Sequence, residues 1–145
     1  MTKKNNDKSL KKFSHSIGQN WFHIVLIPKK RNPIFQYPKM KFFGEEAFEV
    51  VCKNHKIEIF EKEVMENHVH LFVDCPPDYG IRQLIRIIKG GTSFYIRKRV
   101  PSLKRYTHFW SSGYMYRSIS NVTADTVTKY IANSNVWTGF VLKKK

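Results

Sequence analysis

The chain has 145 residues, enough for one domain with its own core, and 41% of them are hydrophobic, as in soluble globular proteins. Its longest aliphatic run, Ile24 to Ile27, is too short to cross a bilayer, and residues 1–12 lack the apolar segment of a secretory signal. Cys52 and Cys75 predict free thiols in a reducing cytoplasm rather than a disulfide framework.

The charge is strongly positive. Lysine and arginine number 26 against 11 acidic residues, a net charge of +15, and 14% of the residues are aromatic. Eight lysines near the two ends account for only part of the excess, so the body of the chain is itself basic. This composition indicates a nucleic-acid partner. An anionic membrane surface would instead require an amphipathic basic helix, so we expect no membrane partner.

The pattern along the chain predicts a disordered basic tail over residues 1–16 and a single domain over residues 17–142. Residues 56–65 alternate apolar and charged side chains, and a tight turn at Glu66 and Asn67 leads into the next strand, so these two strands form a hairpin. The expected strands cover residues 18–28, 56–65, 68–73 and 109–120, and the expected helices cover residues 44–55, 81–99 and 123–134.

His68 and His70 are the candidate functional residues of the hairpin. Side chains alternate along a strand, so both imidazoles lie on one face and Val69, Leu71 and Val73 lie on the other. Two imidazoles about 6–7 Å apart along the backbone can converge on one metal ion. The motif alone is weak, because structural zinc sites usually show four ligands. The alternative is a pair of partly exposed histidines that bind nothing.

The helix over residues 81–99 carries an apolar stripe and a basic row at the same spacing. This row and the basic end of the helix are our candidate DNA contacts, with an ordinary solvated face as the alternative: Arg82, Arg86, Lys89, Arg97, Lys98 and Arg99. Gly90 and Gly91 interrupt the helix and predict either a kink or a close approach of another backbone.

The order β-α-β-β-α-β-α predicts an α+β fold. Its first six elements form the split βαβ arrangement of ferredoxin-like and RRM domains, an antiparallel sheet with two helices on one face. The last helix is an addition. If the two core helices cover the face of Val69, Leu71 and Val73, the histidine face stays open and the added helix is its natural lid.

The chain resembles the single-tyrosine transposases of the IS200/IS605 group, in the HUH endonuclease superfamily. The segment MENHVHLFVDCPP is similar to their histidine motif, and WFHIVLIPKKRNPIF is similar to their first strand. IRQLIRIIKGGTSFYIR is similar to their second helix, and HFWSSGYMYRSISNVTADTVTKYIANS to their last strand and tyrosine helix. Several motifs in the right order make this resemblance specific.

The resemblance implies that His68 and His70 bind a divalent metal ion, Mg²⁺ or Mn²⁺, and that Tyr130 on the added helix is the nucleophile. It also implies cleavage and rejoining of single-stranded DNA through a covalent 5′-phosphotyrosine, with recognition of hairpins at element ends. The implied assembly is a homodimer in which one subunit's tyrosine helix can complete the other's histidine site. The metal would assist by polarising the scissile phosphate.

The chain departs from the family pattern at two positions. Asn67 stands where the family commonly has Asp, and Ser134 stands where it commonly has the Gln that completes the metal site. Ser134 shares a helix face with Tyr130, since the two are four residues apart. A hydroxyl is a weaker ligand than an amide oxygen, so either Ser134 or Asn133 is the candidate third ligand, and these departures put the activity of this copy in question.

Two other functions remain open from the sequence. A non-catalytic or decayed RRM-like module would share the fold, but the strand that would carry an RNP1-like run of glycine and aromatic residues carries His-x-His instead. A metal-dependent hydrolase that uses water would not need Tyr130.

Overall fold

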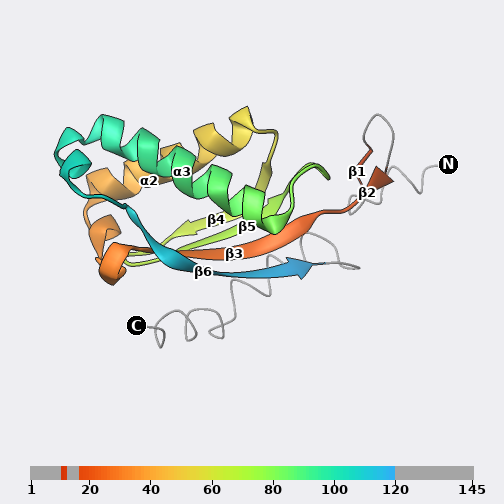
Figure 1. The fold of residues 1–145 in the computed structure, drawn as a ribbon, viewed down its shortest axis with the longest axis horizontal. Helices are drawn as coiled ribbons and strands as arrows, with labels where there is room; N and C mark the ends of the chain where they lie inside the picture. The colour runs from red at the N-terminus through yellow and green to blue at the C-terminus, as the bar shows by residue number, and fades with distance from the viewer. Residues whose placement is uncertain (1–10, 13–16, 120–145) are drawn as a thin grey trace.

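The computed structural model describes residues 11–12 and 17–119 of the chain. The described part is a four-stranded antiparallel sheet in the order β4-β5-β3-β6, with two helices on the same side of it (Figure 1). The strands are β3 (Trp21–Pro28), β4 (Glu58–Val64), β5 (Val69–Asp74) and β6 (Trp110–Ile119). The helices are α2 (Pro38–Asn54) and α3 (Ile81–Arg99). The predicted α+β fold is therefore confirmed for this part of the chain.

Shorter elements connect these. A small hairpin joins β1 (Lys11–Lys12) to β2 (Ile17–Gly18), and 3-10 turns follow β3 and α3: η1 (Lys29–Arg31), η2 (Ile34–Gln36) and η3 (Pro101–Arg105). The predicted tyrosine helix and the rest of the predicted tail lie outside the described residues. No described helix is both long enough and apolar enough to span a membrane.

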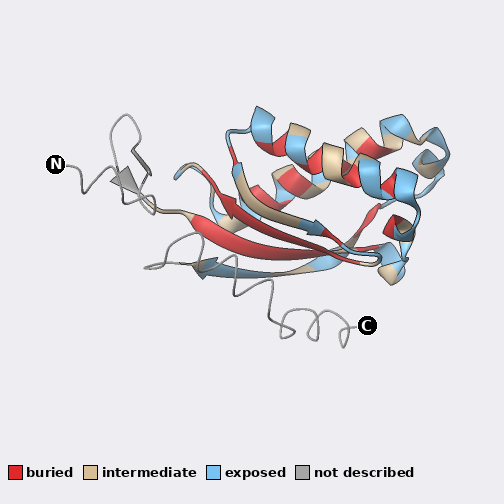
Figure 2. Ribbon diagram, turned by 180° about the vertical axis from the view of Figure 1, so that it is seen from behind, coloured by how far each residue is buried: buried red, intermediate tan, exposed pale blue. Residues whose placement is uncertain are grey.

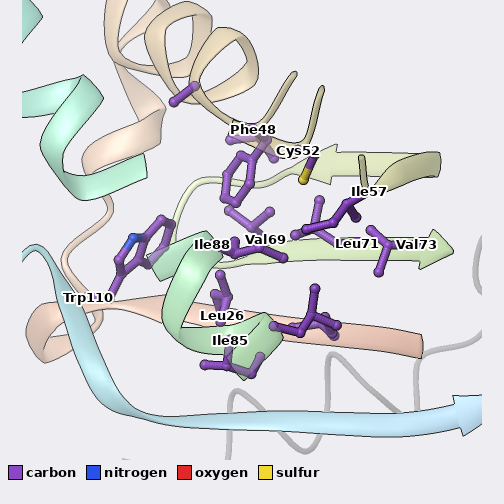
Figure 3. Close-up of a cluster of buried hydrophobic side chains, with 14 of the residues drawn as sticks. Leu26, Phe48, Cys52, Ile57, Val69, Leu71, Val73, Ile85, Ile88 and Trp110 are labelled. Atoms are coloured by element: carbon purple, nitrogen blue, oxygen red, sulfur yellow. The ribbon is translucent and has the colours of Figure 1, made fainter. Parts of the chain in front are cut away.

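The core lies between the helices and one face of the sheet (Figure 3). Val69 and Leu71 of β5 face this core, as their alternation predicts, and Phe48 of α2 and Ile88 of α3 pack above them. All four side chains are fully buried. Figure 2 shows the same division, with buried residues on the central strands and exposed residues on the outer sides of the helices.

Helices α2 and α3 pack closely at Gly91. A methyl group built at this glycine would lie 2.8 Å from Cγ1 and 2.9 Å from Cγ2 of Val51 on α2, closer than real carbon contacts allow. Around Gly90 the space is open. Helix α3 is continuous from Ile81 to Arg99. The predicted kink is therefore wrong, and the close neighbour of Gly91 is the side chain of Val51 rather than another backbone.

Helix α2 begins earlier than the sequence analysis predicted. We expected a loop around Pro33 and Pro38 and a helix from residue 44, whereas α2 starts at Pro38. The prediction was wrong because proline fits the first turn of a helix, where its missing N–H would have no partner inside the helix. The early start brings Met40 into the core, where it is 9% exposed.

Strand β4 contains a β-bulge. Its pairing with β5 shifts between Ile59, which faces Val73, and Glu61, which faces Phe72, so Phe60 is the extra residue. One extra residue exchanges the faces of the residues that follow it. Ile59 and Val64 therefore both reach the helix side, although their positions differ by an odd number, which in a regular strand would place them on opposite faces. On the other face, Glu63 pairs with His70.

Candidate functional site

The histidine pair lies on the face of the sheet that is turned away from α2 and α3. His68 directly precedes β5 and His70 is its second residue, and their ring centroids are 5.0 Å apart. Only 4% of His68 and 5% of His70 is exposed. The expected sharing of one face is confirmed. The partial exposure expected under the alternative is wrong, because both imidazoles are buried.

The ring of His68 is oriented by its neighbour in sequence. Its Nδ1 atom donates a hydrogen bond to Oδ1 of Asn67 over 2.8 Å. A neutral imidazole that donates from Nδ1 presents a lone pair on Nε2. That Nε2 atom is buried and has no hydrogen-bond partner within the described part of the chain. The amide of Asn67 therefore supplies the acceptor that orients the His68 ring, at the position where the resembled family commonly has aspartate.

A third histidine, His23, contacts this pair from the neighbouring strand β3. Its Nε2 atom lies 3.3 Å from Nδ1 of His70, and the two rings lie nearly parallel, with an interplanar angle of 21°. One of these nitrogens donates and the other accepts, so the contact fixes the orientation of the His70 ring through its Nδ1 atom. His23 is 1% exposed, and the sequence analysis did not identify it.

The three imidazoles are held neutral. Burial, followed by the nearby His70 and Arg117, lowers the pKa of His23 to about 3. Burial and His70 likewise lower the pKa of His68 to about 4, with Arg31 contributing in the same direction and Glu63 opposing it. Burial also lowers the pKa of His70. Neutral imidazoles are the form that binds metal ions.

Charged and aromatic side chains surround the imidazoles. Arg117 of β6 pairs with His23, and Glu63 of β4 pairs with His70, so a cationic and an anionic residue flank the histidines from the two edge strands. The side chains of Trp21, Phe60 and Phe72 pack against one another on the same face, with centroids 4.9–5.6 Å apart. The site is therefore a small polar cluster that shares its face of the sheet with a cluster of three aromatic side chains.

The donor set suits a divalent ion but is incomplete by itself. Neutral imidazole nitrogens bind first-row transition metals such as Mn²⁺, and the buried Nε2 atom of His68 fits such a role. Among the residues that the structure describes, no group of three His, Cys, Asp or Glu side chains is arranged to hold a metal ion. The third ligand was predicted at Ser134 or Asn133, and both lie outside the described residues, as does Tyr130.

The predicted DNA-contacting residues occupy different surroundings. Arg82 and Arg86 are exposed on α3, in the helix layer rather than on the histidine face. Lys89 instead links α3 to the start of β6, because its Nζ atom donates to the carbonyl oxygens of Ser111 over 2.7 Å and Ser112 over 3.4 Å.

The basic end of α3 has contacts of its own. Nη2 of Arg97 donates to the carbonyl oxygen of Tyr106 over 2.8 Å, and Arg97 lines a cleft at this end of the helix. Nζ of Lys98 lies 5.4 Å from the ring centroid of Phe94. Arg99 donates to the hydroxyl of Tyr95 over 2.6 Å.

The chain is similar in sequence to known transposases. A family model described as "Transposase IS200 like" matches residues 16–134. The chain is 26% identical over 117 residues to the transposase for insertion sequence element IS200 of Salmonella typhimurium, which covers 79% of this chain and 76% of the relative. It is 22% identical over 129 residues to the ISDra2 transposase of Deinococcus radiodurans, covering 87% and 91%.

Two solved structures share the fold. One is a putative transposase from Deinococcus radiodurans, with a TM-score of 0.67 and 21% identity, covering 85% of this chain and 96% of that one. The other is a REP-associated tyrosine transposase bound to a REP hairpin, with a TM-score of 0.58 and 20% identity, covering 89% and 73%. At these identities the likeness concerns the fold.

Proposed function

Because the chain belongs to the family of IS200-like transposases, we propose that it cleaves and rejoins single-stranded DNA at the histidine cluster. The observation that carries this proposal is the buried Nε2 atom of His68, which has no hydrogen-bond partner among the described residues while Asn67 fixes the opposite side of the ring. A histidine prepared in this way is suited to bind a metal ion.

His68 and His70 would hold the metal ion, and Asn67 and His23 orient their rings. Bound there, Mg²⁺ or Mn²⁺ would polarise the scissile phosphate and neutralise its developing charge. Ser134 or Asn133 completes the ligand set. The net charge of +15 attracts the DNA backbone to the protein.

Tyr130 is the nucleophile. Its phenol oxygen attacks the phosphorus and its proton passes to water, while the bond from phosphorus to the 3′ oxygen breaks and that oxygen takes a proton to become a free hydroxyl. One phosphodiester replaces another, so the 5′-phosphotyrosine retains the energy that rejoining requires. Attack by a 3′-hydroxyl then reverses the step and releases Tyr130.

The DNA substrate carries hairpins, and the chain acts as a homodimer whose subunits share their active sites. Support for the hairpin comes from the structural neighbour bound to a REP hairpin. The dimer rests on the family resemblance, in which the tyrosine helix of one subunit can complete the histidine site of the other.

The test uses hairpin-bearing single-stranded DNA with Mn²⁺ or Mg²⁺. We expect a covalent protein–DNA adduct on a denaturing gel, absent in Tyr130→Phe and strongly reduced in His68→Ala. The exposed Tyr37→Phe is the matched control and should form the adduct normally. Cleavage that survives Tyr130→Phe would instead indicate a hydrolase that uses water, and binding without cleavage a non-catalytic module.

A further inference from the structure

The end of β3 runs into a strained basic turn. Two consecutive residues of this turn, Lys30 with φ 56° and Arg31 with φ 55°, adopt left-handed backbone conformations that residues other than glycine rarely occupy. The turn is held in place because the backbone N–H of Lys29 donates to the carbonyl oxygen of Phe109 over 2.9 Å. Such strain concentrates at functional sites, where the surrounding structure enforces it.

This turn forms one wall of a cleft of about 760 Å³. The opposite wall comes from Arg97 and from the segment before β6, with Tyr106 and His108 among its residues. The volume lies within the range of ligand-binding pockets in proteins. None of the described residues that line the cleft carries a carboxylate, so its charge selects for an anion.

Tyr106 and Arg97 contribute an aromatic ring and a guanidinium to the lining of the cleft. Tyr106 is 52% exposed, and the guanidinium of Arg105 lies over its ring, 5.1 Å from the centroid. The Nε atom of Arg97 is buried and has no hydrogen-bond partner among the described residues, although Nη2 of the same side chain bonds the backbone of Tyr106. A planar aromatic face beside cations matches the base and the phosphate of a nucleotide.

The basic turn that lines the cleft is related to the histidine site by the pairing of β3 with β5. Strands β3 and β5 are antiparallel, with Leu26 opposite Val69, so the basic turn after β3 is at the end of the sheet where His68 lies. Arg31 is close enough to His68 for its charge to lower the pKa of that imidazole. The cleft and the histidine site are therefore at the same end of the sheet.

We propose that this cleft binds one unpaired nucleotide of the single-stranded DNA substrate, with the base against Tyr106 and the adjoining phosphate against Lys29 and Lys30. The cleft would thereby read a nucleotide close to the scissile phosphate. The inference rests on the proposed function for the identity of the substrate, but it concerns residues outside the histidine cluster.

The test measures binding of a fluorescent single-stranded oligonucleotide to the full chain by anisotropy at fixed salt. Tyr106→Ala removes the stacking between the base and the aromatic ring and should weaken affinity about tenfold. Tyr106→Phe keeps the ring and should retain affinity. Lys30→Gln should reduce the slope of log affinity against log salt by about 0.7, as expected for one lost contact to a single strand. Phe94→Ala, an exposed aromatic outside the cleft, is the control and should change affinity less than twofold.

A scan with single abasic residues locates the bound nucleotide. At one position near the cleavage site, loss of the base should weaken binding by the wild type about tenfold and binding by Tyr106→Ala hardly at all. Equal losses in both proteins at every position would overturn the proposal, as would tighter binding of RNA than of DNA of the same sequence. Wild-type affinity in Tyr106→Ala and Lys30→Gln would also overturn it, yet the proposed function would stand if adduct formation still required Tyr130.

Discussion

The Nε2 atom of His23 lies 3.3 Å from the Nδ1 atom of His70, although 47 positions separate the two residues in the chain. The contact crosses from β3 to β5 and is buried. Together with the bond from His68 to Asn67, it gives each histidine of the His-x-His pair a partner at Nδ1. Both candidate ligands are thus oriented by a contact at Nδ1.

We expect His23→Ala to weaken Mn²⁺ binding about tenfold, since loss of a partner that orients a metal-binding histidine typically costs ten- to a hundredfold in affinity. Isothermal titration calorimetry measures this directly. His23→Gln places an amide near the lost Nε2 atom and should restore part of the affinity. His55→Ala, which removes an exposed histidine, is the control. Unchanged affinity in a folded His23→Ala protein would exclude an orienting role.

Asn67→Ala should likewise weaken Mn²⁺ binding about tenfold, because Nδ1 of His68 loses its acceptor. Asn67→Asp retains an oxygen at the same place and should bind at least as tightly as the wild type. Glu66→Ala, one residue earlier, serves as the control. If Asn67→Ala and Asn67→Asp bind the metal equally, the hydrogen bond to His68 does not contribute to the site.

The metal-free protein should lose stability as the pH falls below about 6.5. The pKa of His23 is lowered to about 3 and that of His68 to about 4, so in the unfolded chain both take up protons at a pH where the folded protein does not. Their contribution to stability is present above the unfolded pKa and is lost as the pH falls towards the folded pKa. Between about pH 7.5 and about pH 5, His23 alone contributes a loss of about 2 kcal/mol.

Urea unfolding at the two pH values tests this, with His23→Phe as the comparison. Replacing the histidine with a group that does not titrate should flatten the dependence on pH, whatever it does to stability at neutral pH. An equally steep dependence in His23→Phe would show that other groups cause the loss.

Adjacent glycines of α3 should respond in opposite directions to the same substitution. Gly90→Ala meets open space and should stabilise the protein by up to about 1 kcal/mol through helix propensity. Gly91→Ala places a methyl group against the stiff side chain of Val51 and should destabilise by about 1–3 kcal/mol. Thermal unfolding measures both. Equal effects would mean that α2 moves away from α3 at little cost.

The sequence was sufficient to predict the sheet, both core helices and the orientation of the histidine pair. Alternation places Val69 and His70 on opposite faces whatever the rest of the chain does, and those faces are as predicted. The same alternation places His23 on the face opposite Ile24 and Leu26. Alternation does not determine the register between β3 and β5, because register depends on tertiary packing. That register is what places His23 beside His70.

The cleft could not be predicted for the same reason. Its walls come from the turn after β3 and the segment before β6, which lie far apart in the sequence and meet where Lys29 bonds the backbone of Phe109. From the sequence, Arg97 is a candidate only because it is basic and lies on a basic helix end. The left-handed backbone at Lys30 and Arg31 gives no compositional signal, since neither residue is glycine.

The bulge at Phe60 determines both which residues of β4 face the histidines and which face the core. If Phe60 were paired regularly instead of bulged, it would stand opposite Phe72 and every later residue of β4 would exchange faces, sending the carboxylate of Glu63 into the apolar layer beneath the helices and Val64 away from it. One extra residue in an edge strand therefore keeps an acidic side chain beside His70 and an apolar side chain in the core at the same time. A change that straightens β4 while retaining Phe60 would alter the electrostatic surroundings of the histidines and the packing of the core together.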